Sequence, residues 1–82
     1  MSMKEKIEKA IEEKEKYIEN RIKNIQTNLR EMKQWWKKGD EHEVYIRAVW
    51  MVSDAIGIRE AIESIWALVD LWEELDENER KN

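Results

Sequence analysis

The sequence predicts an all-α fold of two long antiparallel helices, a helical hairpin that we expect to dimerise into a four-helix bundle. Three observations support this prediction. The 82 residues include no Pro and only two Gly, so residues that interrupt helices are almost absent. Apolar residues recur at alternating steps of four and three, the spacing of a seam between packed helices. One segment around Gly39 combines a helix stop with a helix start.

The first helix is predicted over residues 3–37. Its apolar stripe consists of Ile7, Ile11, Ile18, Ile22, Ile25, Leu29, Met32 and Trp36. From Ile18 onward the steps are regular, whereas Lys14 and Glu15 interrupt the stripe between Ile11 and Ile18. We expect the indole of Trp66, from the second helix, to fill that gap, while Trp36 lies in the core.

The turn is predicted over residues 38–41. Lys37 and Lys38 suit the negative end of a helix, and Gly39 suits the left-handed position that follows it. Asp40 and Glu43 have the spacing of a capping box that starts the next helix. Because the connection is so short, the two helices should be antiparallel neighbours.

The second helix is predicted from about residue 41 to about residue 77. Gly57 is its weak point, where a kink or break is conceivable. We expect the helix to continue, because the seam keeps its register there, and Gly57→Ala should then keep or raise the melting temperature. The main seam consists of Val44, Ala48, Met51, Ala55, Ile58, Ile62, Ile65, Val69 and Trp72.

A second apolar row beside that seam predicts self-association. One partner helix cannot cover both rows, and an uncovered row would leave a large apolar patch in water. We therefore expect a homodimer with the two second helices at its centre and the first helices outside. The predicted interface residues are Tyr45, Val49, Trp50, Val52, Ile56, Leu68 and Leu75.

Length and charge set broad limits. Residues 1–82 allow a single domain, and the absence of Cys removes disulfides and thiolate metal sites. The net charge of −4 disfavours nucleic acid as a partner. The first 38 residues nevertheless carry +4 and the remainder −8. With no signal-like start and no long apolar run, we expect no membrane span and a cytoplasmic location.

No stretch carries a catalytic signature, so no catalytic, metal-binding or cofactor-binding residue is predicted. His42, the sole histidine, lies among acidic neighbours at a helix start, where adjacent side chains diverge. Glu60-x-x-Glu63 and Glu73-x-x-Asp76 have the spacings with which all-α nucleotide pyrophosphohydrolases hold Mg²⁺. In those enzymes the pairs lie on neighbouring helices, whereas here both fall on one predicted helix.

The expected function is a non-catalytic helical module for protein–protein interaction and assembly, acting as a homo-oligomer. One alternative is a small regulator or inhibitor, of the immunity, antitoxin or phage type, that binds one protein target. A metal-dependent pyrophosphohydrolase-like enzyme is the third. The Lys- and Arg-rich stretch of residues 21–38 is interpreted as a solvated face.

Overall fold

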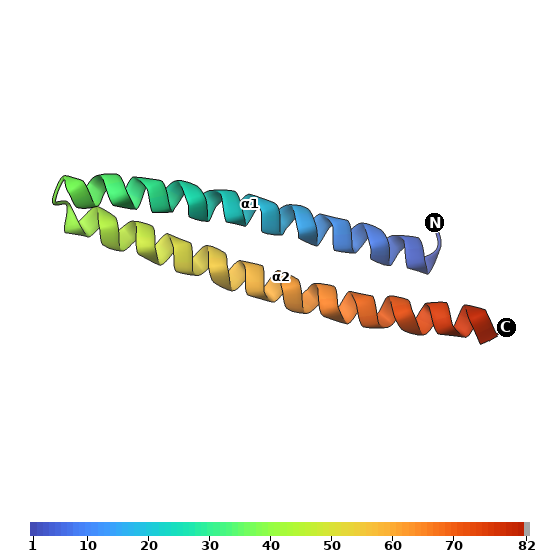
Figure 1. Cartoon of the computed structure of the whole chain (residues 1–82). Helices are drawn as coiled ribbons and strands as arrows, with labels where there is room; N and C mark the ends of the chain where they lie inside the picture. The colour runs from blue at the N-terminus through green and yellow to red at the C-terminus, as the bar shows by residue number, and fades with distance from the viewer. Residues whose placement is uncertain (82) are drawn as a thin grey trace.

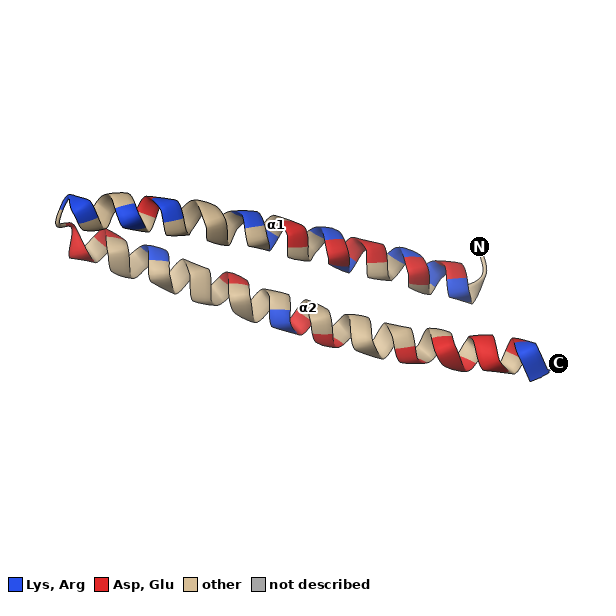
Figure 2. Cartoon of the chain, in the orientation of Figure 1, with Lys and Arg blue, Asp and Glu red and all other residues tan. Residues whose placement is uncertain are grey.

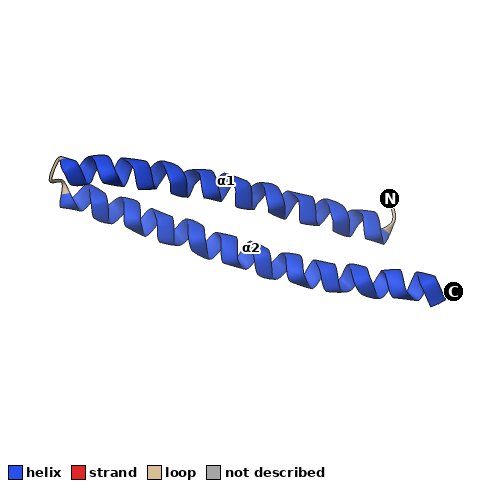
Figure 3. Ribbon diagram, viewed as in Figure 1, coloured by secondary structure: helices blue, strands red, loops and turns tan. Residues whose placement is uncertain are grey.

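The computed structural model describes residues 1–81 and confirms the helical hairpin. Helix α1 spans Met3–Lys37 and helix α2 spans Glu41–Lys81. The two helices run side by side in opposite directions (Figures 1 and 3), as a rod of 66 × 17 × 13 Å. Helix α2 extends four residues beyond the end predicted at about residue 77. Its last turns are held because Lys4 Nζ contacts Asp76 Oδ1 at 2.8 Å and Glu79 Oε2 at 3.2 Å.

Both helix starts and the turn follow from local chemistry. The Ser2 hydroxyl accepts a hydrogen bond from the Glu5 amide at 3.1 Å and caps α1. Gly39 has φ of 76°, and the Asp40 amide donates to the Trp35 carbonyl at 3.1 Å, as in a Schellman motif. Asp40 Oδ1 accepts from the Glu43 amide at 3.1 Å. The predicted turn at Gly39 and the Asp40 cap are confirmed, but the Asp40 amide bonds to Trp35 and not to the Glu43 side chain as a capping box would have it.

Helix α2 runs without a break through Gly57. The backbone of Gly57 is not left-handed, since Gly39 alone has a positive φ among the described residues. A Cβ atom at position 57 would instead lie 2.5 Å from the hydroxyl oxygen of Tyr17. Glycine is therefore used here for the close approach of a side chain from α1, and not for a bend.

The contact between the helices does not use the predicted seams in full. Ala55, Ile62 and Val69 on α2 are exposed, as are their α1 counterparts Ile22, Leu29 and Trp36. The other seam residues still contact the opposite helix. On each helix, a row of residues beside the seam takes the place of the exposed seam residues in this contact. These replacement rows are Arg21, Asn28 and Trp35 on α1, preceded in the same row by the exposed Lys14, and Arg47, Asp54, Ala61, Leu68 and Leu75 on α2.

Polar pairs explain this rotation of the seams. Arg21 Nη1 contacts Asp54 Oδ1 at 2.8 Å, and Asp54 is buried with 5% of its surface exposed. Arg47 donates to Asn28 Oδ1 at 3.2 Å and also pairs with Glu31. A buried carboxylate needs such partners. The rows that carry these polar residues therefore contact each other. As a result, part of each apolar stripe is turned away from the contact between the helices.

Ion pairing also closes the open end of the hairpin. The hydrogen bond to Asp76 raises the pKa of Lys4, and the same bond lowers the pKa of Asp76 below its usual value. The Lys4 ammonium also lies 4.6 Å from the centre of the Trp72 ring. Polar contacts thus hold the helices together at the open end, as they do at the middle.

The hairpin has almost no core of its own. Among the described residues, the buried hydrophobic side chains are Ile7 and Ala61 alone. Two predicted core positions are wrong. Trp36 is 68% exposed and Trp66 is 66% exposed, so Trp66 does not fill the gap at Lys14 and Glu15. The gap instead borders an open hollow between the helices.

Candidate interaction surface

One broad side of the hairpin is apolar along its length. We call it the apolar face, and it combines two half-buried inner rows with two exposed outer rows. The inner rows are Ile11, Ile18, Ile25 and Met32 on α1, and Val44, Met51, Ile58, Ile65 and Trp72 on α2. The outer rows are Ile22, Leu29 and Trp36 on α1, and Ala55, Ile62 and Val69 on α2, where the row begins at the half-buried Ala48.

Two hollows show that the apolar rows of α1 and α2 lie on the same side of the hairpin. Near the turn, Met32 and Trp36 of α1 line a hollow of about 460 Å³ together with Val44 of α2. Near the open end, Ile11 of α1 lines a second hollow of about 210 Å³ with Val69 and Trp72. Since the rows repeat every seven residues, the positions between these two points share the same side.

The opposite side, the polar face, carries the ion pairs. Arg21, Asn24 and Asn28 of α1 line a hollow there with Ser53 and Asp54 of α2. Trp50 borders the same hollow, and the Arg47 guanidinium lies 4.8 Å from the centre of its ring. The hydrogen bond to Asp54 also raises the pKa of Arg21. Most of the charges on this face are paired within the hairpin, although the buried Nε of Arg47 makes no hydrogen bond within the described residues.

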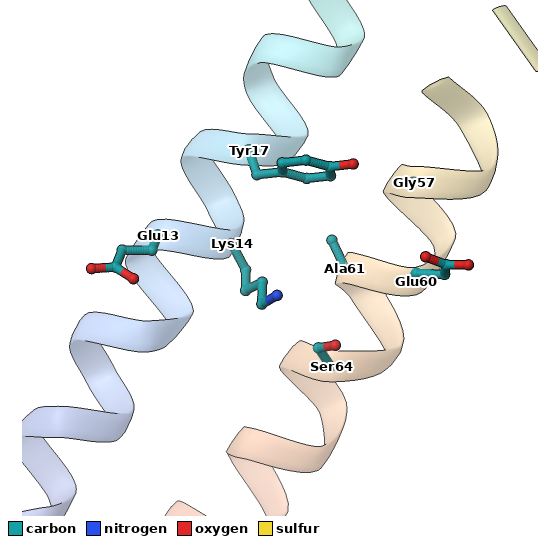
Figure 4. A pocket seen from close by; sticks show the side chains of 7 residues that line it. All are labelled: Glu13, Lys14, Tyr17, Gly57, Glu60, Ala61 and Ser64. Carbon is teal, nitrogen blue, oxygen red and sulfur yellow. The ribbon is translucent and has the colours of Figure 1, made fainter. Parts of the chain in front are cut away.

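Figure 4 shows a second hollow on the polar face, between Tyr17 and Gly57. The Tyr17 ring crosses from α1 towards Gly57, and the Lys14 amine extends towards α2. The carboxylates of Glu13 and Glu60 point away from the space between the helices. The side chains that line this hollow therefore form no nucleophile–base pair and no converging ligand set.

The predicted interface residues fall in three different places. Four of them are exposed. By their heptad positions, these four lie along the side of α2 that faces away from α1, and we call this side the outer edge of α2. Trp50 lies on the polar face. Leu68 and Leu75 are half-buried in the α2 row that contacts α1. The outer edge of α2 consists of Tyr45, Val49, Val52 and Ile56.

Sequence reasoning missed the contribution of α1 to the apolar face. Ile22, Leu29 and Trp36 had been assigned to the contact with α2, because their spacing fits a seam. A signal against that assignment was present in the sequence. Polar residues also recur at seven-residue steps, at Arg21 and Asn28 on one helix and at Arg47 and Asp54 on the other. Such matched charged rows indicate an alternative seam.

The candidate metal ligands are placed apart or are already paired. Glu63 contacts Arg59 at 3.1 Å, and Asp76 contacts Lys4. His42 is exposed in the first turn of α2. Within residues 1–81, no group of three or more His, Cys, Asp or Glu side chains is positioned to hold a metal ion. Neither helix, over the same residues, has an apolar stretch long enough to cross a membrane.

Charges are distributed unevenly along the rod. Acidic residues dominate the last third of α2, whereas basic residues dominate the part of α1 that precedes the turn (Figure 2). Lys23, Arg30 and Lys37 share one heptad row of α1 and are all exposed. The end of α2 away from the turn is therefore acidic, whereas at the turn the basic residues of α1 lie beside Asp40, Glu41 and Glu43.

Comparison of the chain with protein-family models, with curated proteins and with solved structures finds no match in any of the three.

Proposed function

We propose that this protein is a non-catalytic assembly module that self-associates through its apolar face. A second copy lies on that face, and the two hairpins form a four-helix bundle. The observation that carries the proposal is the apolar face itself, which runs the length of both helices and leaves their inner rows only half-buried. In the bundle, these inner rows become the core that the isolated hairpin lacks.

The exposed area supports a second copy as the occupant. The hairpin exposes 6533 Å², whereas a compact monomer of 10.0 kDa exposes about 5,200 Å². The excess is about 1,300 Å² per copy, and a standard stable interface buries about 800 Å² per partner. The hairpin therefore exposes more surface than a compact chain of its mass, and this excess is larger than one side of a standard interface.

The shape of the surface supports the same occupant. Two parallel layers of two helices pack well when each layer offers apolar rows across its whole width. Because α1 contributes Ile22, Leu29 and Trp36, both helices of each copy take part in the interface. This arrangement replaces the dimer expected from sequence, in which the second helices alone met at the centre.

Two matched alanine substitutions on α2 test the proposal. Ala55 lies on the apolar face and Ala67 lies on the side of α2 turned away from it, and both are exposed in the hairpin. Ala55→Glu should dissociate the dimer, because a buried carboxylate without a partner is costly. Ala67→Glu should leave the dimer intact. Size exclusion with light scattering measures both outcomes at micromolar concentration.

A well-folded monomeric wild-type protein would contradict this proposal. The apolar face would then be assigned to a different protein, which is the regulator or inhibitor alternative. Helical circular dichroism distinguishes that result from simple unfolding. Equal dissociation by Ala55→Glu and Ala67→Glu would also contradict the proposal, since the effect would then not depend on the apolar face.

A further inference from the structure

We propose that the two copies lie with their turns at opposite ends of the bundle. This inference rests on the proposed function, and it adds the orientation of the partner. A two-fold axis in the plane of the interface allows two arrangements. In one, the axis runs along the helices and the turns lie at the same end. In the other, the axis crosses the helices and the turns lie at opposite ends.

The charges of the hairpin separate into two halves along its length. Tyr17 meets Gly57 and Arg21 meets Asp54, so residues 21–56 form the turn half, and residues 3–20 with 57–81 form the open half. The turn half has seven Lys and Arg against five Asp and Glu, or +2. The open half has eight against fourteen, or −6, and together they give the net charge of −4.

Orientation decides which halves meet. With the turns at the same end, two open halves of −6 lie side by side. With the turns at opposite ends, each open half of −6 lies against a turn half of +2. Packed helices are about 8–10 Å apart, and the Debye length is about 8 Å at physiological salt. Charge across the interface is therefore incompletely screened, and the opposite-end arrangement is favoured.

The position of one carboxylate, Glu8, favours the same arrangement. Glu8 and Glu15 are exposed and continue, towards the open end, the α1 row of Ile22, Leu29 and Trp36. In the opposite-end arrangement α1 lies against the partner's α1 with Asn20 near the middle, so Glu8 falls beside the part of that helix that carries Lys33, whereas Glu15 falls at the level of the partner's Ile25.

The same-end arrangement gives Glu8 worse surroundings. There, α1 lies against the partner's α2, with the two open ends together. Glu8 then falls at the level of the partner's Val69 and the partner's Glu73, which offer an apolar surface and a second carboxylate. A carboxylate removed from water without a cation is destabilising. For Glu8, the opposite-end arrangement lowers this cost, because the partner's Lys33 lies near the same level.

Spin labels at two matched positions measure the orientation. Gln34 and Asn20 are uncharged, exposed and on the same heptad row of α1, and the chain has no native Cys. Gln34→Cys and Asn20→Cys, each carrying a nitroxide, are compared as dimers by pulsed dipolar spectroscopy. Asn20 lies near the middle of the hairpin and Gln34 near the turn, fourteen residues away.

The opposite-end arrangement predicts a much longer distance for the label near the turn. Fourteen residues in each copy, at a rise of about 1.5 Å, separate the two Gln34 labels by about 40 Å along the bundle axis. The two Asn20 labels remain nearly level with each other. Equal distances for the two label positions would overturn the orientation while leaving the dimer in place. A monomer by light scattering would overturn the orientation and the proposed function together.

Discussion

At the scale of single residues, Gly57 shows how a contact from another helix changes the stability effect that is expected of a substitution. Considered alone, a glycine inside a helix costs about 1 kcal/mol relative to alanine. That reasoning predicts that Gly57→Ala keeps or raises the melting temperature. The Tyr17 hydroxyl lies where the new methyl group would be, so the gain in helix propensity competes with displacement of a side chain.

A double-mutant cycle separates these two effects. Without the hydroxyl, the nearest remaining Tyr17 atom is Cζ, at 3.4 Å from the Cβ position, which is ordinary contact. In the Tyr17→Phe background, Gly57→Ala should therefore stabilise the protein by about 1 kcal/mol. In the wild-type background the gain should be smaller or absent. Urea unfolding of the four proteins measures the coupling, and equal effects in both backgrounds would show that the hydroxyl contact is unimportant.

At the scale of elements, the helices and the turn could be predicted well from the sequence, because their signals are local. Gly39, Asp40 and Glu43 specify the turn through backbone conformation and capping, which need no distant partner. The rotation of each helix about its own axis could not be predicted in the same way. Apolar spacing defines a stripe, but it does not say whether α1 or another chain covers that stripe.

The same limit explains the outcome for the aromatic residues. Trp36 and Trp72 share the apolar spacing of their stripes, yet Trp36 is exposed and Trp72 is half-buried. Trp72 is held by α1, since its Nε1 donates to Glu8 Oε1 at 3.0 Å. Trp36 lies just before the turn, on the outer row of the apolar face. The difference depends on what lies beside each ring in three dimensions.

The Asp40 cap gives a prediction at this scale. Asp40→Ala removes the hydrogen bond from the Glu43 amide and should destabilise the protein by about 1 kcal/mol. Asp40→Asn keeps a side-chain oxygen that accepts this bond and should lose much less. Thermal unfolding of the two variants measures the difference. Equal losses would indicate that the charge of Asp40, and not its capping bond, stabilises the start of α2.

At the scale of the whole molecule, stability and assembly are coupled. Only Ile7 and Ala61 are buried hydrophobic residues among those described, so the isolated hairpin depends on helix propensity and on polar pairs. Chains of this size commonly gain stability by oligomerisation. On the polar face, ion pairs such as Arg21–Asp54 and Arg47–Glu31 form within one hairpin, whereas the outer rows of the apolar face stay exposed to water. Folding and self-association should therefore be one concentration-dependent process.

Two glutamate substitutions distinguish the apolar-face dimer from a dimer centred on α2. Leu29 lies on the α1 part of the apolar face and Ile56 on the outer edge of α2, and both are exposed in the hairpin at 40% and 52%. Neither substitution buries a charge within one copy. Leu29→Glu should weaken the apolar-face dimer by at least about tenfold, or about 1.4 kcal/mol, because the new carboxylate faces the partner's apolar rows. Ile56→Glu should have a smaller effect.

If α2 alone formed the centre of the dimer, the order of the two effects would be reversed. Dilution series followed by light scattering give the dissociation constants, and a larger loss for Ile56→Glu would return the interface to the outer edge of α2.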